Sequence, residues 1–211
     1  MKSVLISIQP KWVEKIASGK KIIEVRKSRP KLETPFKCYI YCTKDKYQHI
    51  YDLRPFTNGE ISLSLTQHNK TSLVPQNYWN GKVIGEFVCD KIYDLFPFGM
   101  GTGIELLDEL VSPEMFCKES CLTEQEICDY IGEKDGYGWH ISDLKIYNKP
   151  KELSEFKKPC YINEKTCYDC QHTWGFDYVK GCNGKIEKAP QSWCYVGGLK
   201  WKISRLKKWR R

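Results

Sequence analysis

Three charged side chains near the N-terminus have the types and spacing to recognise or transform a polar ligand: Lys21, Glu24 and Arg26. In the sequence KIIEVR, Glu24 and Arg26 are two residues apart, so a β-strand would place both on one face and Ile23 and Val25 on the other. Lys21 has the parity of Ile23, so it joins Glu24 only if the strand entry is bent or bulged. The alternative interpretation is a solvated, charged edge of an ordinary sheet.

The segments before this strand would position the three residues. The apolar run around Leu5 and Ile8 predicts a first strand. Pro10 suits the first turn of a helix, and Gly19 suits its C-terminal stop, so residues 10–18 are predicted to be helical.

A sequence signature runs through this strand–helix–strand unit. It comprises Gln9-Pro10, Trp12, Gly19-Lys20-Lys21, Glu24 and Arg26, and it resembles the signature of the ASCH family within the PUA-like superfamily. The resemblance extends over residues 1 to about 156 and is strongest to the ASCH proteins of phages and prophages. It implies an α+β fold, a PUA-like mixed β-barrel with flanking helices, and RNA or other nucleic acid as the ligand of a cleft that holds the signature.

The later segments are predicted as follows. Residues 36–44 and 81–95 are expected to be strands, 97–103 a connecting loop, 104–133 helical with a capping box at Thr123 and Glu126, and 136–156 a final strand. Residues 45–80 are expected to be an insertion, with a hairpin around Asn58-Gly59. These expectations give a barrel domain over residues 1–156, a Cys-rich extension over 157–198 that packs back on it, and a basic tail over 199–211.

The extension contains a candidate metal site. One CxxC pair, Cys167 and Cys170, has the spacing with which two thiolates bind one tetrahedral ion. We predict a structural zinc ion held by Cys160, Cys167, Cys170 and Cys182. Disulfides in an oxidised protein and a redox-active CxxC remain alternatives.

The distribution of charge indicates a polyanionic partner. Residues 1–37 hold ten Lys or Arg and three acids, and residues 199–211 hold seven basic residues and no acid, whereas 85–135 hold thirteen acids and three basic residues. The sequence shows neither a membrane-spanning run nor a signal peptide, so a cytoplasmic protein without a membrane partner is expected.

We therefore expect RNA or DNA, preferably single-stranded, to bind in the cleft and to the basic tail, with a flipped or modified base as one form of the ligand. In this interpretation Lys21, Arg26 and Glu24 contact phosphates or base edges, while Gln9, Trp12, Trp139, Ser192 and Trp193 border the ligand.

Two other functions remain open. The first is an enzyme in the same cleft, with Lys21 and Glu24 in acid–base roles. Some small ASCH proteins resemble amidohydrolases that act on acylated cytidines and use a Thr three residues after the Lys; Glu24 stands at that position here, so a ribonuclease-like reaction is the other enzymatic alternative. The second is a phage regulator that binds a host protein, with the acidic segment 104–133 as its surface.

Overall fold

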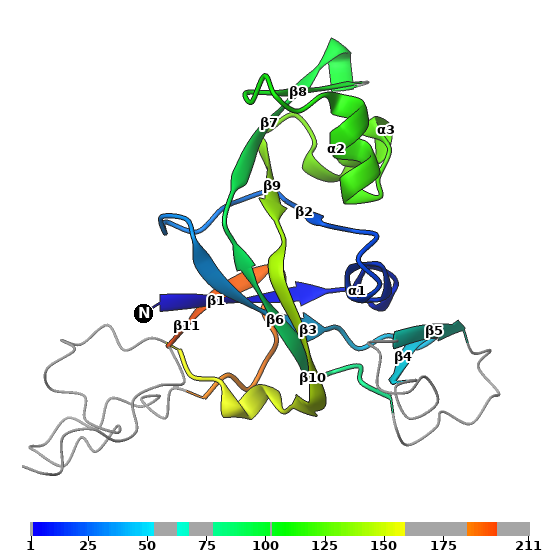
Figure 1. The fold of residues 1–211 in the computed structure, drawn as a ribbon, viewed down its shortest axis with the longest axis vertical. Helices are drawn as coiled ribbons and strands as arrows, with labels where there is room; N and C mark the ends of the chain where they lie inside the picture. The colour runs from blue at the N-terminus through cyan, green and yellow to red at the C-terminus, as the bar shows by residue number, and fades with distance from the viewer. Residues whose placement is uncertain (1, 53–62, 68–77, 102, 159–184, 198–211) are drawn as a thin grey trace, which may run out of the picture.

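The computed structural model describes residues 2–52, 63–67, 78–101, 103–158 and 185–197. In this part of the chain the protein is a mixed α+β structure, with strands arranged in three sheets and helices at their ends (Figure 1). No helix in the described ranges is long and apolar enough to cross a bilayer.

The largest sheet has five strands in the order β10-β6-β3-β1-β11. Their bounds are Ser142–Lys151 for β10, Val83–Cys89 for β6, Phe36–Cys42 for β3, Lys2–Ile8 for β1 and Trp193–Gly197 for β11. Strands β1 and β3 are parallel, and the other neighbours are antiparallel. The last described strand therefore pairs with the first, which places β11 at an edge of this sheet beside the N-terminal strand.

The second sheet has four antiparallel strands in the order β2-β9-β7-β8. Their bounds are Ile23–Arg26 for β2, Gly136–His140 for β9, Ile92–Phe98 for β7 and Gly103–Leu106 for β8. A third, two-stranded sheet consists of β4 (Gln48–Asp52) and β5 (Leu63–Gln67), which pair antiparallel within the predicted insertion. The turn predicted at Asn58-Gly59 lies outside the described residues.

Two continuous segments of chain run from one of the two larger sheets into the other, one as β6 and β7 and the other as β9 and β10. The segment predicted as one strand over 81–95 is two strands, β6 and β7, which belong to different sheets, and the segment 136–156 divides into β9, β10 and a short 3-10 helix, η3 (Leu153–Glu155). The junctions between the two strands of each segment lie side by side, and there the His140 N–H donates to the Lys91 carbonyl. Apolar residues resume at or directly after each junction, at Ile141 and Ile92, so the sequence pattern does not separate the two strands.

The helices cover the ends of the sheets. Helix α1 (Pro10–Ala17) packs Val13 and Ile16 into the main core together with Trp139. Helices α2 (Pro113–Ser120) and α3 (Glu124–Ile131) lie together at one end of the molecule beside β7 and β8 (Figure 1). They cover the Ile23 and Val25 face of β2 through Phe116 and Ile127.

The helical prediction for 104–133 is correct only from residue 113 onward. Residues 103–106 form β8, and the 3-10 helix η2 (Gly99–Gly101) stands in the predicted 97–103 loop. The apolar residues that favoured a helix over 104–111 do not form a buried stripe, because Leu107 and Leu110 are 71% and 88% exposed. The predicted capping box is present: Thr123 Oγ1 accepts from the Glu126 N–H, and Glu126 accepts from the Thr123 N–H.

Candidate functional site

Lys21, Glu24 and Arg26 meet in the space between the two larger sheets. β2 is an edge strand of the four-stranded sheet and carries Glu24 and Arg26 on the face opposite Ile23 and Val25, as the alternation predicts. Arg26 reaches across to the five-stranded sheet, where its Nη2 donates a 2.7 Å hydrogen bond to the Ser7 carbonyl at the end of β1. The two sheets are therefore tied together at this site by a charged side chain.

Glu24 is the centre of the charged network. Its Oε1 lies 2.8 Å from Arg26 Nη2, and its Oε2 lies 3.5 Å from Lys21 Nζ. All three side chains are buried, with exposed fractions between 2% and 7%. One carboxylate thus faces two basic groups in a setting where water screens little, so the network keeps a positive excess in the interior.

Lys21 reaches Glu24 because the chain bends before β2. The strand begins only at Ile23, and the Lys21 N–H donates to the Lys15 carbonyl of α1, while the Ile22 N–H donates to the Glu119 carbonyl of α2. The bend that the sequence required for Lys21 to join Glu24 is therefore present.

The C-terminal end of α2 holds the Lys21 ammonium group. Lys21 Nζ donates a 2.6 Å hydrogen bond to the Ser120 carbonyl, one of the carbonyls left without an intrahelical partner at the end of that helix. The negative end of the helix dipole favours a cation there. Burial nevertheless lowers the pKa of Lys21 below its ordinary value, and the nearby Glu24 charge offsets only part of that effect.

Ser192 and Trp193 return to this site from the far end of the chain. The Ser192 carbonyl accepts from the Ser7 N–H at 2.9 Å, and the Ser7 hydroxyl donates to the Pro190 carbonyl at 2.6 Å. Arg26 Nη1 donates to Ser192 Oγ over a longer 3.5 Å. Residues 190–193 thus lie directly beside Arg26, although more than 160 residues separate them in sequence.

The predicted aromatic residues occupy two different places. Trp139 is fully buried next to Glu24 in the β2–β9 register, and its ring centroid lies 6.0 Å from that of Trp193. Trp193 is half-buried and donates from Nε1 to Ser28 Oγ at 3.1 Å. Trp12 is half-buried on α1, where the Nζ atoms of Lys11, Lys15 and Lys21 lie 4.5, 5.2 and 5.1 Å from its ring centroid.

Three buried polar atoms in this region have no hydrogen-bond partner among the described residues: Glu24 Oε2, Arg26 Nε and Trp139 Nε1. They belong to residues that are neighbours within β2 or across the β2–β9 pair. Such atoms are costly in a protein interior unless water or a ligand satisfies them. Arg26 Nε and Trp139 Nε1 therefore offer two donors to a polar group that enters the site, whereas Glu24 Oε2 already lies 3.5 Å from the Lys21 ammonium group.

Two other predicted or conspicuous polar residues lie outside the network. Gln9 is exposed at the N-cap of α1, and its side chain makes no capping hydrogen bond. His140 pairs with Asp90 on the strand bend, at 2.7 Å between Nδ1 and Oδ1. Burial would raise the pKa of Asp90, but the hydrogen bond with His140 and the other local hydrogen bonds bring that pKa below its usual value.

The predicted zinc ligands Cys160, Cys167, Cys170 and Cys182 all lie outside the described residues. Within the described ranges, no cluster of His, Cys, Asp and Glu has the arrangement to hold a metal ion. The cysteines described there, including Cys38, Cys89 and Cys117, are free thiols.

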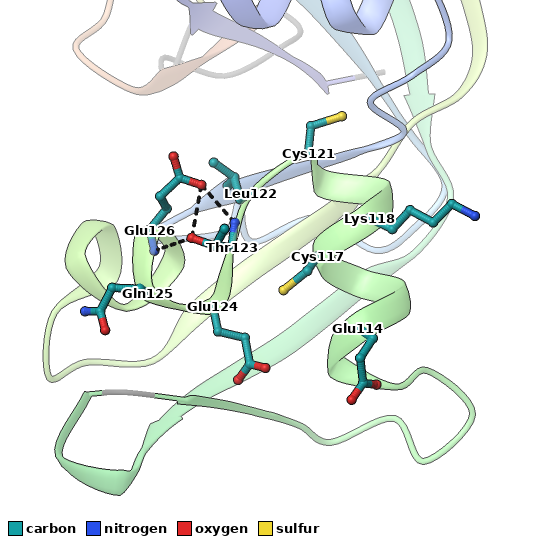
Figure 2. A pocket seen from close by; sticks show the side chains of 9 residues that line it. All are labelled: Glu114, Cys117, Lys118, Cys121, Leu122, Thr123, Glu124, Gln125 and Glu126. Carbon is teal, nitrogen blue, oxygen red and sulfur yellow. Dashed lines mark hydrogen bonds between the residues drawn. The ribbon is translucent and has the colours of Figure 1, made fainter.

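A separate open hollow of ≈ 680 Å³ lies at the junction of α2 and α3 (Figure 2). Two polar residues of its lining, Thr123 and Glu126, already hydrogen-bond each other in the capping box of α3. Cys121, which also lines the hollow, donates from Sγ to the Lys20 carbonyl, next to Lys21. The hollow therefore lies next to the charged network, and both adjoin the C-terminal end of α2.

Two backbone carbonyls belong to the site and could not be identified from the sequence. The Ser7 and Ser120 carbonyls complete the hydrogen bonding of Arg26 and Lys21, yet a backbone carbonyl leaves no trace in residue type. Ser7 itself carried a weak clue, because a serine interrupts an otherwise apolar strand, Leu5 to Ile8.

Comparison with family models of proteins gives no match, and comparison with curated proteins gives none either. Among solved structures, the chain is similar to the ASCH protein from Zymomonas mobilis, at 19% identity and a TM-score of 0.43 over 72% of this chain and 73% of that one. Two point mutants of the same protein give TM-scores of 0.44 and 0.42 at the same identity. These structures are of the family that the signature around Lys21 resembles. Similarity at this level places no functional residue, and the phage-type relationship stays a prediction.

Proposed function

We propose that this protein is a PUA-like, ASCH-type module that binds single-stranded nucleic acid, with RNA preferred, at the site formed by Lys21, Glu24, Arg26 and residues 190–193. The observation that carries the proposal is the pair of buried donors without a hydrogen-bond partner, Arg26 Nε and Trp139 Nε1, beside the ring of Trp193. A nucleobase edge presents both donors and acceptors, and an aromatic ring offers it a stacking face.

The ligand has to displace part of the protein to reach these atoms, because the network is almost fully buried. The 3.5 Å hydrogen bond between Arg26 and Ser192 is the longest one that the 190–193 segment makes at this site. A base that displaces it therefore sacrifices little hydrogen-bond energy. Extruded or single-stranded bases suit such an interior site better than a base held within a duplex.

The direct test is a fluorescence-anisotropy titration of the full chain with single-stranded RNA, single-stranded DNA and duplex. We expect salt-sensitive binding, strongest for single strands, that weakens at least tenfold in Trp193→Leu and in Ser192→Trp, which places a bulky side chain beside Arg26. Lys82→Gln serves as the control, since Lys82 forms an exposed pair with Glu152. Absence of binding by the wild-type protein would refute the proposal.

A variant that ends at Gly198 separates the site from the basic tail. Loss of binding on truncation alone, with Trp193→Leu unchanged, would assign binding to residues 199–211 and refute the role of the site.

The second candidate is an enzyme that acts on RNA or on a nucleoside in the same site. The lowered pKa of Lys21 favours it, because a shift in this direction makes an amine a better proton acceptor, and Glu24 lies 3.5 Å from its Nζ as the partner in acid–base work. Incubation with labelled RNA and with acylated cytidine, followed by product analysis for wild type and Lys21→Met, tests both reactions. Product formed at equal rates by both proteins, or none formed by wild type, would exclude this function.

We also propose a structural zinc ion bound by Cys160, Cys167, Cys170 and Cys182. The ligand types and the CxxC spacing support it. Metal analysis of the purified protein should give one zinc per chain, and Cys167→Ser with Cys170→Ser should release it. A protein that contains no zinc, or that keeps it in this variant, would contradict the assignment.

A further inference from the structure

Trp12 carries a second feature of the site, because three lysine ammonium groups surround its ring. Lys11, Lys15 and Lys21 place Nζ within 4.5, 5.2 and 5.1 Å of the centroid. Cations near an aromatic ring are attracted by its electron-rich face. The ring therefore gathers charges that would otherwise repel one another.

Two carboxylates interact with this group of charges, and both are already engaged by other groups. Glu24 is shared between Lys21 and Arg26 inside the network. Glu126 is the carboxylate of α3 that feels both Lys11 and Lys15, and it already accepts hydrogen bonds from the N–H and hydroxyl of Thr123. Outside the buried network, the two basic side chains Lys11 and Lys15 thus share the one carboxylate of Glu126, which the cap of α3 already engages.

The lysines on the outer side of Trp12 are accessible and already oriented. Lys11 and Lys15 are one helical turn apart on α1 and are partly exposed, whereas Lys21 is buried. Their contact with the ring restricts side chains that are usually mobile, so an anion that binds them has less ordering to impose.

We propose that Lys11 and Lys15, held against Trp12, form a phosphate-binding site at the rim of the Lys21–Glu24–Arg26 site. Trp12 supports the lysines and is not the surface on which a base stacks; that role belongs to Trp193. The ligand is a backbone phosphate of the single-stranded nucleic acid whose base enters the site, so this inference rests on the proposed function.

Salt dependence distinguishes a phosphate contact from a stacking contact. The logarithm of the binding constant of single-stranded nucleic acid falls with the logarithm of salt concentration, with a slope of about −0.7 for each neutralised phosphate. Loss of a stacking contact lowers affinity and leaves this slope unchanged, because no counterion is released by stacking.

The experiment measures this slope for an eight-nucleotide RNA and for an abasic sugar–phosphate strand of the same length. The variants are Lys11→Gln with Lys15→Gln, Trp12→Leu, and a control with the same charge change at two exposed residues, Lys145→Gln with Lys149→Gln. Circular dichroism and melting of each variant establish that it is folded.

We expect the Lys11/Lys15 variant and Trp12→Leu each to lose roughly 0.7 to 1.4 of the slope on both ligands, while the control keeps the wild-type slope. An unchanged slope in the Lys11/Lys15 variant would overturn this inference. If the wild-type protein binds and Trp193→Leu does not, the proposed function would still stand. Weaker binding by Trp12→Leu at an unchanged slope would make Trp12 a stacking residue and overturn its supporting role. No binding of either ligand by wild type would remove both proposals together.

Discussion

The ammonium group of Lys21 donates a 2.6 Å hydrogen bond to the backbone carbonyl of Ser120, which lies ninety-nine residues later in the chain. The end of α2 is thereby fixed to the start of β2, and the charged network is fixed to the core that packs between them. The position of the site consequently depends on α2 as much as on the strand that carries the signature.

Replacement of Glu24 by Gln should destabilise the fold strongly. The variant leaves Lys21 and Arg26 buried without a counter-charge, which typically costs about 3–5 kcal/mol. Lys82→Gln, in the exposed pair with Glu152, should change the free energy of unfolding by less than about 1 kcal/mol. Urea denaturation monitored by circular dichroism compares the two, and equal losses would mean that Glu24 is not the charge that balances the network.

The lowered pKa of Lys21 predicts the sign of a pH effect on stability. Between its folded pKa and 10.5, the unfolded chain keeps a proton that the folded protein has lost, so the unfolded state binds more protons and stability rises with pH. The free energy of unfolding of wild type relative to Lys21→Met should therefore increase as pH approaches 10.5, by about 1.4 kcal/mol per unit by which the pKa is lowered. A difference that falls with pH would show that Glu24 raises the pKa more than burial lowers it.

Gly138 fixes the distance between α2 and the sheet. A Cβ at this position of β9 would lie 2.5 Å from Phe116 Cε2 and 3.1 Å from Ile23 Cγ2. Gly138→Ala should therefore destabilise by about 1–3 kcal/mol and loosen the contact between Ser120 and Lys21. The matched control is Gly197→Ala, where the nearest atoms are 4.0 Å away. Thermal melting of both variants tests this, and an equal, small effect would contradict the packing.

Two free thiols should react slowly in the folded protein. Burial raises the pKa of Cys89 to about 12, and burial with nearby acids raises that of Cys117 to about 11. The reactive form is the thiolate, so at pH 8 each should alkylate at least about 100-fold more slowly in the native protein than in urea. Mass spectrometry of iodoacetamide-labelled peptides measures both rates, and fast native labelling of Cys117 would show that burial and the nearby acids do not raise the pKa of its thiol.

Much of the site could be predicted from sequence because its geometry is local. The two-residue spacing of Glu24 and Arg26, the helix start at Pro10 and the capping box at Thr123 depend on neighbouring residues and were confirmed. The helix predicted over residues 104–112 was wrong because Leu107 and Leu110 have helical spacing without burial, and periodicity alone does not report exposure.

The remaining features of the site are non-local. The pairing of β11 with β1 brings Ser192 to Ser7 across the whole length of the chain, and no residue pattern specifies that partner. The burial of Lys21 likewise follows from the placement of α2, since a lysine in a basic segment is ordinarily solvated. The zinc site and the ligand-binding roles stay predictions.

Photochemical crosslinking tests, without any mutation, the proposal that single-stranded nucleic acid enters the site beside Trp193. An RNA that carries 4-thiouridine is irradiated with the full-length protein, and mass spectrometry locates the crosslinked peptide. We expect crosslinks within residues 188–195 or 11–27, the segments that contain or lie beside Lys21, Glu24 and Arg26. Crosslinks confined to residues 199–211 or to the surface of α2 and α3 would contradict it.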